Sequence, residues 1–415
     1  MSEWQKLKDV VVKIVGGGTP SRKKDEYYHG DIPWVTVKDL IATSISDAQE
    51  KITPQAIQES AANLIPKSNV IIATRMALGK AFINEVDVAI NQDLKALIPN
   101  KEKVIPKYLL YTYLSNKEKI EILGSGTTVK GIRLEQINGL EIFVPSLEEQ
   151  KKITFILSSV DQIIEKTKAI IEQTEKVKKG LMQQLLTEGI GHTKFKETDI
   201  GNIPEEWEVL TFEEISDLIT KGTTPTTYGF SYEDTGVNFI RTENIDEQGK
   251  VVKDYMKKIS LAAHQKLKRS ILKEKDILFS IAGVGLGQCT IVKEDLLPAN
   301  TNQALAIIRI SNPLFDHHFV YTLLLSHYIT KQIKAVSTIG AQPNISLKQI
   351  GDFKIPKPTL REQKRIVDIL SSVGEKIQRE KVKLDTLQTI KTGLMQSLLT
   401  GEIRVKADEA EVTEV

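Results

Sequence analysis

The sequence predicts an α+β protein made of two similar domains, each followed by one long helix, with the two helices paired antiparallel. Three observations support this fold class: an internal repeat at constant spacing, short β-branched runs separated by Gly, Pro and Asn within each copy, and a heptad pattern after each copy. The 415 residues are enough for two or more domains.

The internal repeat is clearest at the end of each copy. The segment VPSLEEQKKITFIL from Val144 returns as KPTLREQKRIVDIL from Lys357, and GLMQQLLTEGI from Gly180 returns as GLMQSLLTGEI from Gly393. Both pairs are separated by 213 residues. Upstream the match is weaker but keeps its order, as in GGGTP against KGTTP and NQDLKAL against NQALAII. A unit of about 200 residues is long enough to be a domain.

The repeat divides the chain into five segments. Runs such as NVIIAT and DILFSI predict strands, and IPKYLLYTYLSN predicts a helix, so the first part of each copy is a globular domain. The expected segments are a first domain at 1–145, a first spacer helix at 146–190, a second domain at 191–357, a second spacer helix at 358–403 and an acidic, flexible tail at 404–415.

The first long helix is expected over 147–187, about 60 Å at 1.5 Å per residue, with Pro145-Ser146 as its stop and N-cap. Apolar residues alternate by three and four along it, which predicts one seam for a partner helix. The predicted interface residues are Ile153, Ile156, Val160, Ile163, Ile170, Val177 and Leu181, with Thr167 and Thr174 completing the spacing.

The second long helix is expected over 360–400. Its predicted interface residues are Ile366, Ile369, Val373, Leu387, Ile390 and Leu394. Lys376, Glu380 and Lys383 fall on the same seam, with Ile377 and Leu384 one step away, which predicts that the stripe drifts midway. A pseudo-twofold axis across the pair would make the helices antiparallel and put the domains at opposite ends. The alternative is that each helix packs on its own domain.

Composition limits the kinds of partner. With 56 Lys+Arg and 54 Asp+Glu the net charge is +2, so any nucleic-acid binding must depend on local patches. The single cysteine, Cys289, excludes an internal disulfide and a cysteine zinc site, and we expect it to be buried. The absence of a long apolar run and of a signal-peptide pattern predicts a cytoplasmic protein without membrane contact.

Catalytic signatures are missing from the sequence. Gly79-Lys80 lacks the first glycine and the Ser/Thr of a phosphate loop, and the glycines of AGVGLGQ have the wrong spacing for a dinucleotide fingerprint. No two prolines are adjacent, and His317-His318 has no metal-ligand spacing around it. The sequence therefore predicts no catalytic residue, no cofactor and no metal on this chain.

Candidate DNA-binding residues are of two kinds. The window from Lys250 to Lys275 has nine Lys/Arg against two acidic residues, although a solvated lysine-rich face would look the same. Elsewhere, Gly-rich loops with Ser, Thr and cations suit phosphate contact, and Asn, Gln and Arg can read bases, or can instead be turn residues. The candidates are Thr19, Arg22, Lys23, Lys24, Thr36, Lys38, Arg75, Lys80, Gln92, Thr127, Thr128, Lys130, Arg133, Thr223, Thr224, Arg241, Asn244, Lys257, Lys258, Lys266, Lys268, Arg269, Gln342 and Asn344.

The paired helix starts, Leu147-Glu149-Gln150-Ile153 and Leu360-Glu362-Gln363-Ile366, together with GLMQ-x-LLT at the end of each helix, resemble the specificity subunit of a type I restriction-modification enzyme. The resemblance covers nearly the whole chain. It implies two target-recognition domains that each read half of a bipartite, gapped sequence in double-stranded DNA, and helices that set the gap and dock two methyltransferase subunits.

The resemblance also implies where cofactors bind. S-adenosylmethionine is expected on the methyltransferase partner, and ATP and Mg on the restriction partner, of which a complex holds up to two copies. Three alternatives stay open from the residues themselves: a stand-alone nuclease or methyltransferase, a different DNA-binding scaffold with paired half-sites, and a structural bridge between protein partners.

Overall fold

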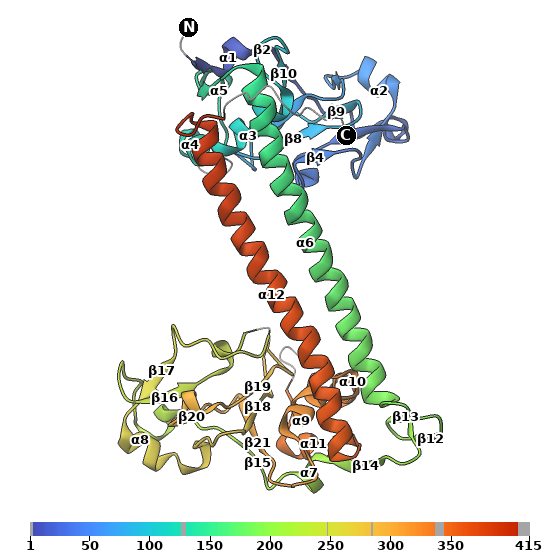
Figure 1. Ribbon diagram of the computed structural model, residues 1–415, viewed down its shortest axis with the longest axis vertical. Coiled ribbons are helices and arrows are strands. Elements are labelled where there is room, and N and C mark those ends of the chain that lie inside the picture. Colours follow the sequence, from blue (N-terminus) through green and yellow to red (C-terminus); the bar gives the residue numbers. More distant parts are fainter. Residues whose placement is uncertain (1–2, 126–129, 247, 284, 337–343, 406–415) are drawn as a thin grey trace. The chain divides into compact units, whose positions relative to one another are not determined.

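The computed structural model describes residues 3–125, 130–246, 248–283, 285–336 and 344–405. The chain forms two compact units, Met1–Ala169 with Lys381–Val415, and Ile170–Glu380 (Figure 1). Each unit therefore contains one globular domain and half of each long helix, α6 (Leu147–Thr187) and α12 (Leu360–Leu399). The predicted helix bounds are confirmed within one residue.

The domain of the first unit is built on two sheets. The larger has the strand order β2-β10-β7-β8-β4, and the smaller has the order β5-β3-β9-β6 with β3 and β9 parallel. Helices α3 (Pro106–Ser115) and α4 (Lys117–Leu123) follow β10. The strands are β2 (Val11–Gly16), β3 (Ile32–Val35), β4 (Ser44–Ile45), β5 (Lys51–Ile52), β6 (Leu64–Ile65), β7 (Val70–Ala73), β8 (Ala81–Asn84), β9 (Val88–Ile90) and β10 (Leu94–Pro99).

The domain of the second unit repeats this plan. Its sheets have the orders β15-β21-β18-β19 and β17-β16-β20, and β16 and β20 are parallel like β3 and β9. Helices α9 (His317–Leu324) and α10 (His327–Val336) correspond to α3 and α4. The strands are β15 (Leu218–Lys221), β16 (Val237–Ile240), β17 (Lys257–Ile259), β18 (Ile277–Ser280), β19 (Cys289–Ile291), β20 (Ala299–Thr301) and β21 (Leu305–Arg309).

Smaller elements complete each unit. The strand before the domain pairs with the strand after it, as β1 (Trp4–Lys6) with β11 (Glu141–Phe143) and β14 (Glu208–Thr211) with β22 (Lys354–Lys357). The hairpin β12 (Phe195–Thr198) and β13 (Gly201–Pro204) precedes the second domain. Short helices are α1 (Leu7–Val10), α2 (Pro54–Gln58), α5 (Leu134–Asn138), α7 (Phe212–Ile215), α8 (Leu261–Lys266) and α11 (Leu347–Gly351).

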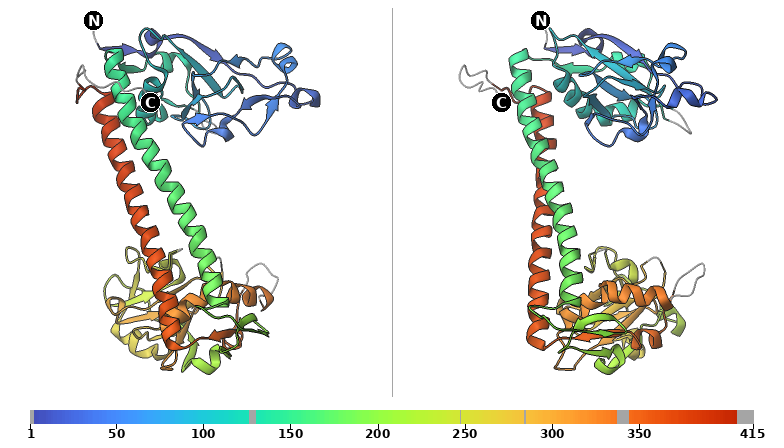
Figure 2. Two further views of the ribbon diagram at one scale, coloured as in Figure 1. Left: turned by 45° about the vertical axis from the view of Figure 1, so that its right-hand side comes forward. Right: turned by 90° about the vertical axis from the view of Figure 1, so that its right-hand side faces the viewer.

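The cores show how the long helices pair within each unit. In the first unit, Ile153 and Leu157 from the start of α6 share a core with Leu398 and Leu399 from the end of α12. In the second unit, Leu185 and Leu186 share a core with Ile366 and Leu370. The start of one helix thus packs beside the end of the other in both units, so the pairing is antiparallel (Figures 1 and 2). The same side chains also pack on the domain, so both predicted modes of packing occur together.

The buried stripe of the helices follows a different phase from the predicted seam. Ile163, Ile170, Val177 and Ile390 are 44%, 39%, 50% and 47% exposed, so their assignment to the interface is wrong. The buried or half-buried stripe on α6 is Ile153, Leu157, Val160, Ile164, Thr167, Ile171, Thr174, Lys178, Leu181 and Leu185. Neighbouring apolar pairs such as Ile163-Ile164 offer two equally apolar phases, and packing selects one.

The predicted drift of α12 is also wrong. Its stripe is Ile366, Leu370, Val373, Ile377, Glu380, Leu384, Leu387, Lys391, Leu394 and Leu398, each buried or half-buried. Every position lies 213 residues after a stripe position of α6. Ile377 and Leu384 are on the stripe, whereas Lys376 and Lys383 are exposed. Ile156 and Ile369 flank the stripe and pack against the unit cores. Both helices therefore keep one heptad phase throughout.

A buried glutamine anchors the start of each long helix. Gln150 is 0% exposed; its Oε1 accepts from the N–H of Ile105 at 2.9 Å, and its Nε2 donates to the carbonyls of Lys103 and Pro145 at 2.9 Å. The equivalent residue of α12, Gln363, is also 0% exposed: its Oε1 accepts from the N–H of Asp316, and its Nε2 donates to the carbonyls of Leu314, before α9, and Pro358, before α12. Each glutamine ties its helix to the loop that precedes α3 or α9.

The neighbouring glutamate binds the chain that leaves the other helix. Glu149 accepts from Arg404 at 2.8 and 2.9 Å and from the N–H of Val405 at 3.1 Å. Hydrogen bonding by Arg404 lowers the pKa of Glu149, so this contact is complete at neutral pH and is lost as the pH falls through the lowered pKa. Arg404 and Val405 are thus anchored, although the sequence places them in the flexible tail; residues 406–415 lie outside the described residues.

In the second unit Glu362 does the same for the chain after α6. It accepts from the N–H of Ile190 at 2.9 Å and from Trp207 Nε1 at 3.1 Å, and it contacts His192 Nε2 at 2.9 Å. Ser146 and Thr359 cap the two helices by accepting from Glu149 and Glu362 N–H groups, as the sequence predicts for Ser146. We name Glu149-Gln150 and Glu362-Gln363, with these partners, the two helix-start clamps.

We predict that Gln150→Ala lowers the free energy of unfolding of the first unit by about 1–3 kcal/mol, because the N–H of Ile105 and two carbonyls lose their buried partner. Hydrogen exchange at Ile105 should accelerate. Gln162→Ala, an exposed change on the same helix, should alter stability by less than about 0.5 kcal/mol. Equal, small effects of both variants on chemical denaturation would contradict the clamp.

Candidate nucleic-acid interface

Two loops of each domain are held in contact by a glycine. The loop after β2 passes against the turn between β9 and β10, and a Cβ on Gly17 would lie 2.2 Å from the carbonyl oxygens of Ile90 and Asn91. In the second domain, a Cβ on Gly222 would lie 2.1 Å and 2.2 Å from the carbonyl oxygens of Thr301 and Asn302. Only glycine allows this backbone approach, so the duplicated glycines define one loop arrangement in both domains.

A threonine–glutamine pair joins the two loops in each domain. Thr19 Oγ1 donates to Gln92 Oε1, and Thr224 Oγ1 donates to Gln303 Oε1. Both glutamines are exposed, so their amide groups reach the surface at the loop contact. Thr19, Gln92 and Thr224 are predicted candidates; Gln303 was missed, although the repeat aligns NQALAII with NQDLKAL and could have identified it. We name these the Thr–Gln pairs.

Two further loops of the first domain adjoin its Thr–Gln pair. The hydroxyl of Thr74 donates to the carbonyl of Asp93 at 3.0 Å, and Arg75 lies 3.6 Å from the Asp93 carboxylate. The N–H of Ile132 donates to Thr74 O at 3.0 Å, which brings the loop with the exposed Lys130 and Arg133 alongside. The predicted candidates Thr127 and Thr128 lie outside the described residues.

The second domain assembles its loops in a similar way. Arg269 donates to Thr223 Oγ1 at 3.1 Å, next to the Thr–Gln pair. The N–H of Ile281 donates to Ala304 O at 2.9 Å, and Ala282 bridges to the exposed Asn344. Four candidates, Thr223, Thr224, Arg269 and Asn344, are thus on connected loops. Gln342 lies outside the described residues.

Two predicted cations of the first domain already have acidic partners. Arg22 makes two hydrogen bonds to Glu50, at 2.7 and 3.0 Å, and lies 4.3 Å above the ring of Tyr28. Lys24 contacts Glu59 at 2.8 Å and lowers the pKa of that carboxyl to about 2. Lys23, between them, is exposed. Arg22 and Lys24 therefore offer phosphate less charge than the sequence suggests.

Asn244 is not placed to read a base. It is 0% exposed, and its Oδ1 accepts from the N–H of Arg241 at 2.9 Å, which closes the turn after β16. Thr36 occupies the matching turn after β3, where its N–H and hydroxyl donate to Asp39. A side-chain amide or carboxylate that caps its own turn is turned inward and cannot reach a base. Asn244 is therefore a turn residue, which is one of the two roles that the sequence left open. The side chain of Arg241 is paired with Glu243 at 2.6 Å.

The basic window spreads over three short elements. Lys257 and Lys258 are on β17, Lys266 is on α8, and Lys268 and Arg269 form the turn at Lys268–Ser270. All of these are exposed except Lys258, which is half-buried. In the first domain, Lys38 and Lys80 are exposed as well, and Lys80 Nζ donates to the carbonyl of Leu40 at 3.4 Å.

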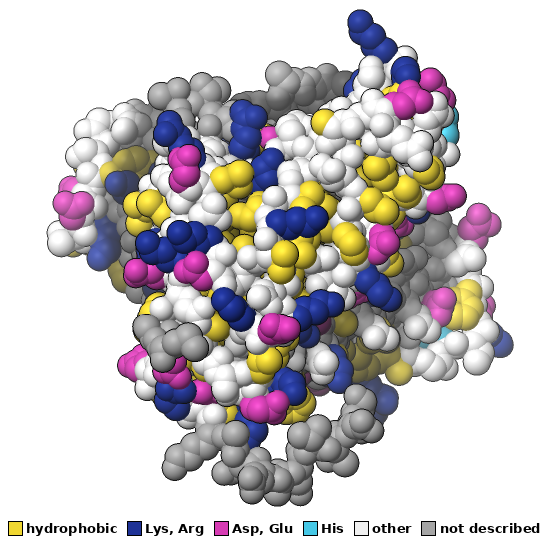
Figure 3. Space-filling view, turned by 90° about the horizontal axis from the view of Figure 1, so that it is seen from above, with side chains coloured by type: hydrophobic (Ala, Val, Ile, Leu, Met, Phe, Trp, Pro, Cys, Tyr) yellow, Lys and Arg dark blue, Asp and Glu magenta, His cyan; other side chains and the backbone are white. Residues whose placement is uncertain are grey.

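Charges of both signs are interspersed on the face of the molecule that Figure 3 draws. In the face drawn in Figure 3, Lys and Arg alternate with Asp and Glu, and no field of one sign covers it. This agrees with the net charge of +2 and leaves phosphate attraction to individual loops.

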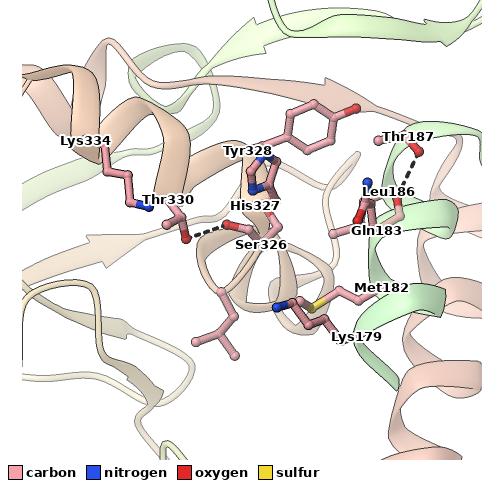
Figure 4. A pocket seen from close by; sticks show the side chains of 11 residues that line it. Lys179, Met182, Gln183, Leu186, Thr187, Ser326, His327, Tyr328, Thr330 and Lys334 are labelled. Carbon is pink, nitrogen blue, oxygen red and sulfur yellow. Dashed lines mark hydrogen bonds between the residues drawn. The ribbon is translucent and has the colours of Figure 1, made fainter. Parts of the chain in front are cut away.

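A pocket of about 350 Å³ lies in the second unit between α6 and the junction of α9 and α10 (Figure 4). Lys179 and Met182 line it from the helix, and His327, Tyr328 and Lys334 from α10. Burial raises the pKa of Tyr328 to about 12, so its hydroxyl is neutral at physiological pH. No predicted DNA-binding residue is among the residues that line this pocket.

Other features of the described residues restrict the chemistry. No group of His, Cys, Asp and Glu among them has the geometry of a metal site, and Cys289 is buried with a raised pKa caused by burial. None of their helices combines the length and apolar character needed to cross a membrane.

We predict that Gly222→Ala destabilises the second unit by about 1–3 kcal/mol, because the added methyl collides with the backbone of Thr301 and Asn302. Gly180→Ala is the matched control: its Cβ meets nothing within 4 Å inside α6, so it should stabilise by about 0.5–1 kcal/mol. Thermal unfolding of both variants measures the difference, and the same sign for both would refute the close loop contact.

Comparison with known proteins shows similarity over most of the chain. Residues 1–176 and 204–389 match the family model described as type I restriction modification DNA specificity domain. The chain is 28% identical to the type I restriction enzyme MjaIX specificity subunit of Methanocaldococcus jannaschii, covering 97% of this chain and 93% of that protein. It is 30% identical to the putative type I restriction enzyme MjaX specificity subunit of the same organism, covering 97% and 94%.

A solved structure has the same fold. The type I restriction-modification system S subunit from M. genitalium superposes with a TM-score of 0.56 at 17% identity, covering 95% of both chains.

Proposed function

Because the chain belongs to the type I restriction-modification DNA specificity family, we propose that its two domains read the two halves of a gapped, bipartite sequence in double-stranded DNA. The observation that carries this proposal is the duplicated loop arrangement, in which a glycine, a Thr–Gln pair and a nearby arginine recur in both domains. The family match confirms the prediction that the chain is a specificity subunit rather than a stand-alone enzyme.

Direct readout is assigned to the variable side chains around each Thr–Gln pair. In the first domain these are Arg75, Lys130 and Arg133, and in the second Arg269 and Asn344, together with the exposed lysines of β17 and α8. Arg and Asn can pair bidentately with guanine and adenine. Because the two sets differ in residue type, the two half-sites should differ in sequence.

The long helices are proposed to set the gap and to dock two methyltransferase subunits. Support comes from the single heptad phase of α6 and α12 and from the exposed faces opposite the stripe, where Phe155 is 72% exposed. S-adenosylmethionine would then be held by the methyltransferase subunits, ATP and Mg by restriction subunits, and the complex would act in the cytoplasm.

Co-expression with a methyltransferase subunit of the same system, followed by methylome sequencing, tests this function. We expect methylated adenines or cytosines within one two-part motif that has an unspecified gap. A continuous, ungapped motif, or no motif dependent on this chain, would overturn the bipartite reading. The experiment also distinguishes this function from a structural bridge between protein partners, because with such a bridge the methylated sequence would not depend on either domain.

A second prediction concerns the spacer. Seven residues inserted into both helices, after Thr167 and after Glu380, keep the heptad phase and add about 10 Å. At 3.4 Å per base pair, the methylated motif should keep both half-sites and gain a gap about three base pairs longer. Insertion of four residues at the same places should break the stripe and abolish methylation. A changed half-site in the seven-residue variant would contradict the separation of reading from spacing.

A further inference from the structure

The Thr–Gln pairs are shared by two domains whose other surface residues differ. Thr19 and Thr224 follow the equivalent strands β2 and β15. Gln92 and Gln303 lie in the equivalent turns between β9 and β10 and between β20 and β21. The surrounding residues change: Arg75 of the first domain aligns with Ala282 of the second, and Gly131 aligns with Asn344. Side chains that read different bases must differ between the domains, whereas side chains that do the same work in both can be the same.

The hydrogen bond fixes how each amide is presented. The threonine hydroxyl donates to the glutamine Oε1, so the Nε2 group, with its two N–H donors, is the part left for a ligand. A phosphodiester oxygen only accepts hydrogen bonds, and it is the same for every base sequence. An outward amide donor on a loop held rigid by glycine therefore matches a phosphate better than a base edge.

A cation stands beside each pair. Arg75 reaches Asp93, which directly follows Gln92, and Arg269 donates to Thr223, which directly precedes Thr224. The two arginines come from different elements, the loop after β7 and the turn at Lys268–Ser270, yet both are next to a Thr–Gln pair. Arg269 therefore adds positive charge beside the second pair, whereas the charge of Arg75 is partly balanced by Asp93.

We propose that Gln92 and Gln303 are duplicated phosphate anchors, which bind the DNA sugar–phosphate backbone in the same way at both half-sites and set the register of each domain on the duplex. The proposal rests on the proposed function, because it requires that both domains lie on DNA. It assigns a sequence-independent contact to residues that the two domains share and leaves base readout to those they do not.

The Gln92→Glu, Gln303→Glu double variant tests this assignment. A glutamate still accepts the hydroxyl hydrogen of Thr19 or Thr224, so the loop contact is kept, but it has no N–H to donate and it repels phosphate. The variants are purified with their methyltransferase subunits. Binding is measured by fluorescence anisotropy on two labelled duplexes of equal length, one with the methylome-defined target and one without it.

We expect the double variant to bind both duplexes about tenfold or more weakly, by the same factor, with an unchanged methylation motif and unfolding temperature. Gln58→Glu, an exposed change of the same charge on α2, should leave both affinities unchanged. Loss confined to the target duplex would identify base readers and overturn the proposal. Unchanged binding to both duplexes would also overturn the proposal and would show that the Thr–Gln pairs only hold the loops together. If the wild-type complex shows no binding or motif, the proposed function fails instead.

Discussion

The two helix-start clamps are the constraint on which the rest of the molecule depends. Gln150 and Gln363 are wholly buried, and each satisfies three backbone groups that would otherwise be unpaired in the core. An unpaired buried backbone group costs about as much as a lost hydrogen bond or more, so each glutamine can hold its helix in only one rotation. With that rotation, Ile153 and Leu157 of α6 and Ile366 and Leu370 of α12 lie in the unit cores.

Glu149 and Glu362 connect the start of each long helix to the end of the other helix, and so hold the two helices antiparallel. Each carboxylate binds the chain that has just left the other helix, through Arg404 and Val405 in one unit and through Ile190, His192 and Trp207 in the other. The two clamps use the same helix position but different partners. One partner is a permanently charged arginine, and the others are neutral donors and a histidine, so the two units reach the same geometry by different chemistry.

The loops around the two Thr–Gln pairs are also built from repeated residues. Gly17 and Gly222 allow two backbones to touch, and the Thr–Gln pairs close the contact at the surface. Around this shared frame the residues differ: Arg22 and Lys24 are bound to Glu50 and Glu59 in the first domain, whereas the second presents Arg269 and several exposed lysines. A common frame with different side chains is the arrangement expected of two domains that bind one polymer and read different sequences in it.

The sequence alone determined the duplication, the bounds of both long helices, the burial of Cys289 and the family, because repeats, heptads and the paired P-x-L-x-E-Q starts are local patterns. Tertiary structure decided the helix phase: Ile163 and Ile164 are equally apolar, and packing buries Ile164 and leaves Ile163 44% exposed. It also decided that Gln303 meets Thr224, because a contact between residues 79 positions apart cannot be read from composition or spacing. Asn244 could cap its own turn or read a base by residue type, and its complete burial decided for the turn.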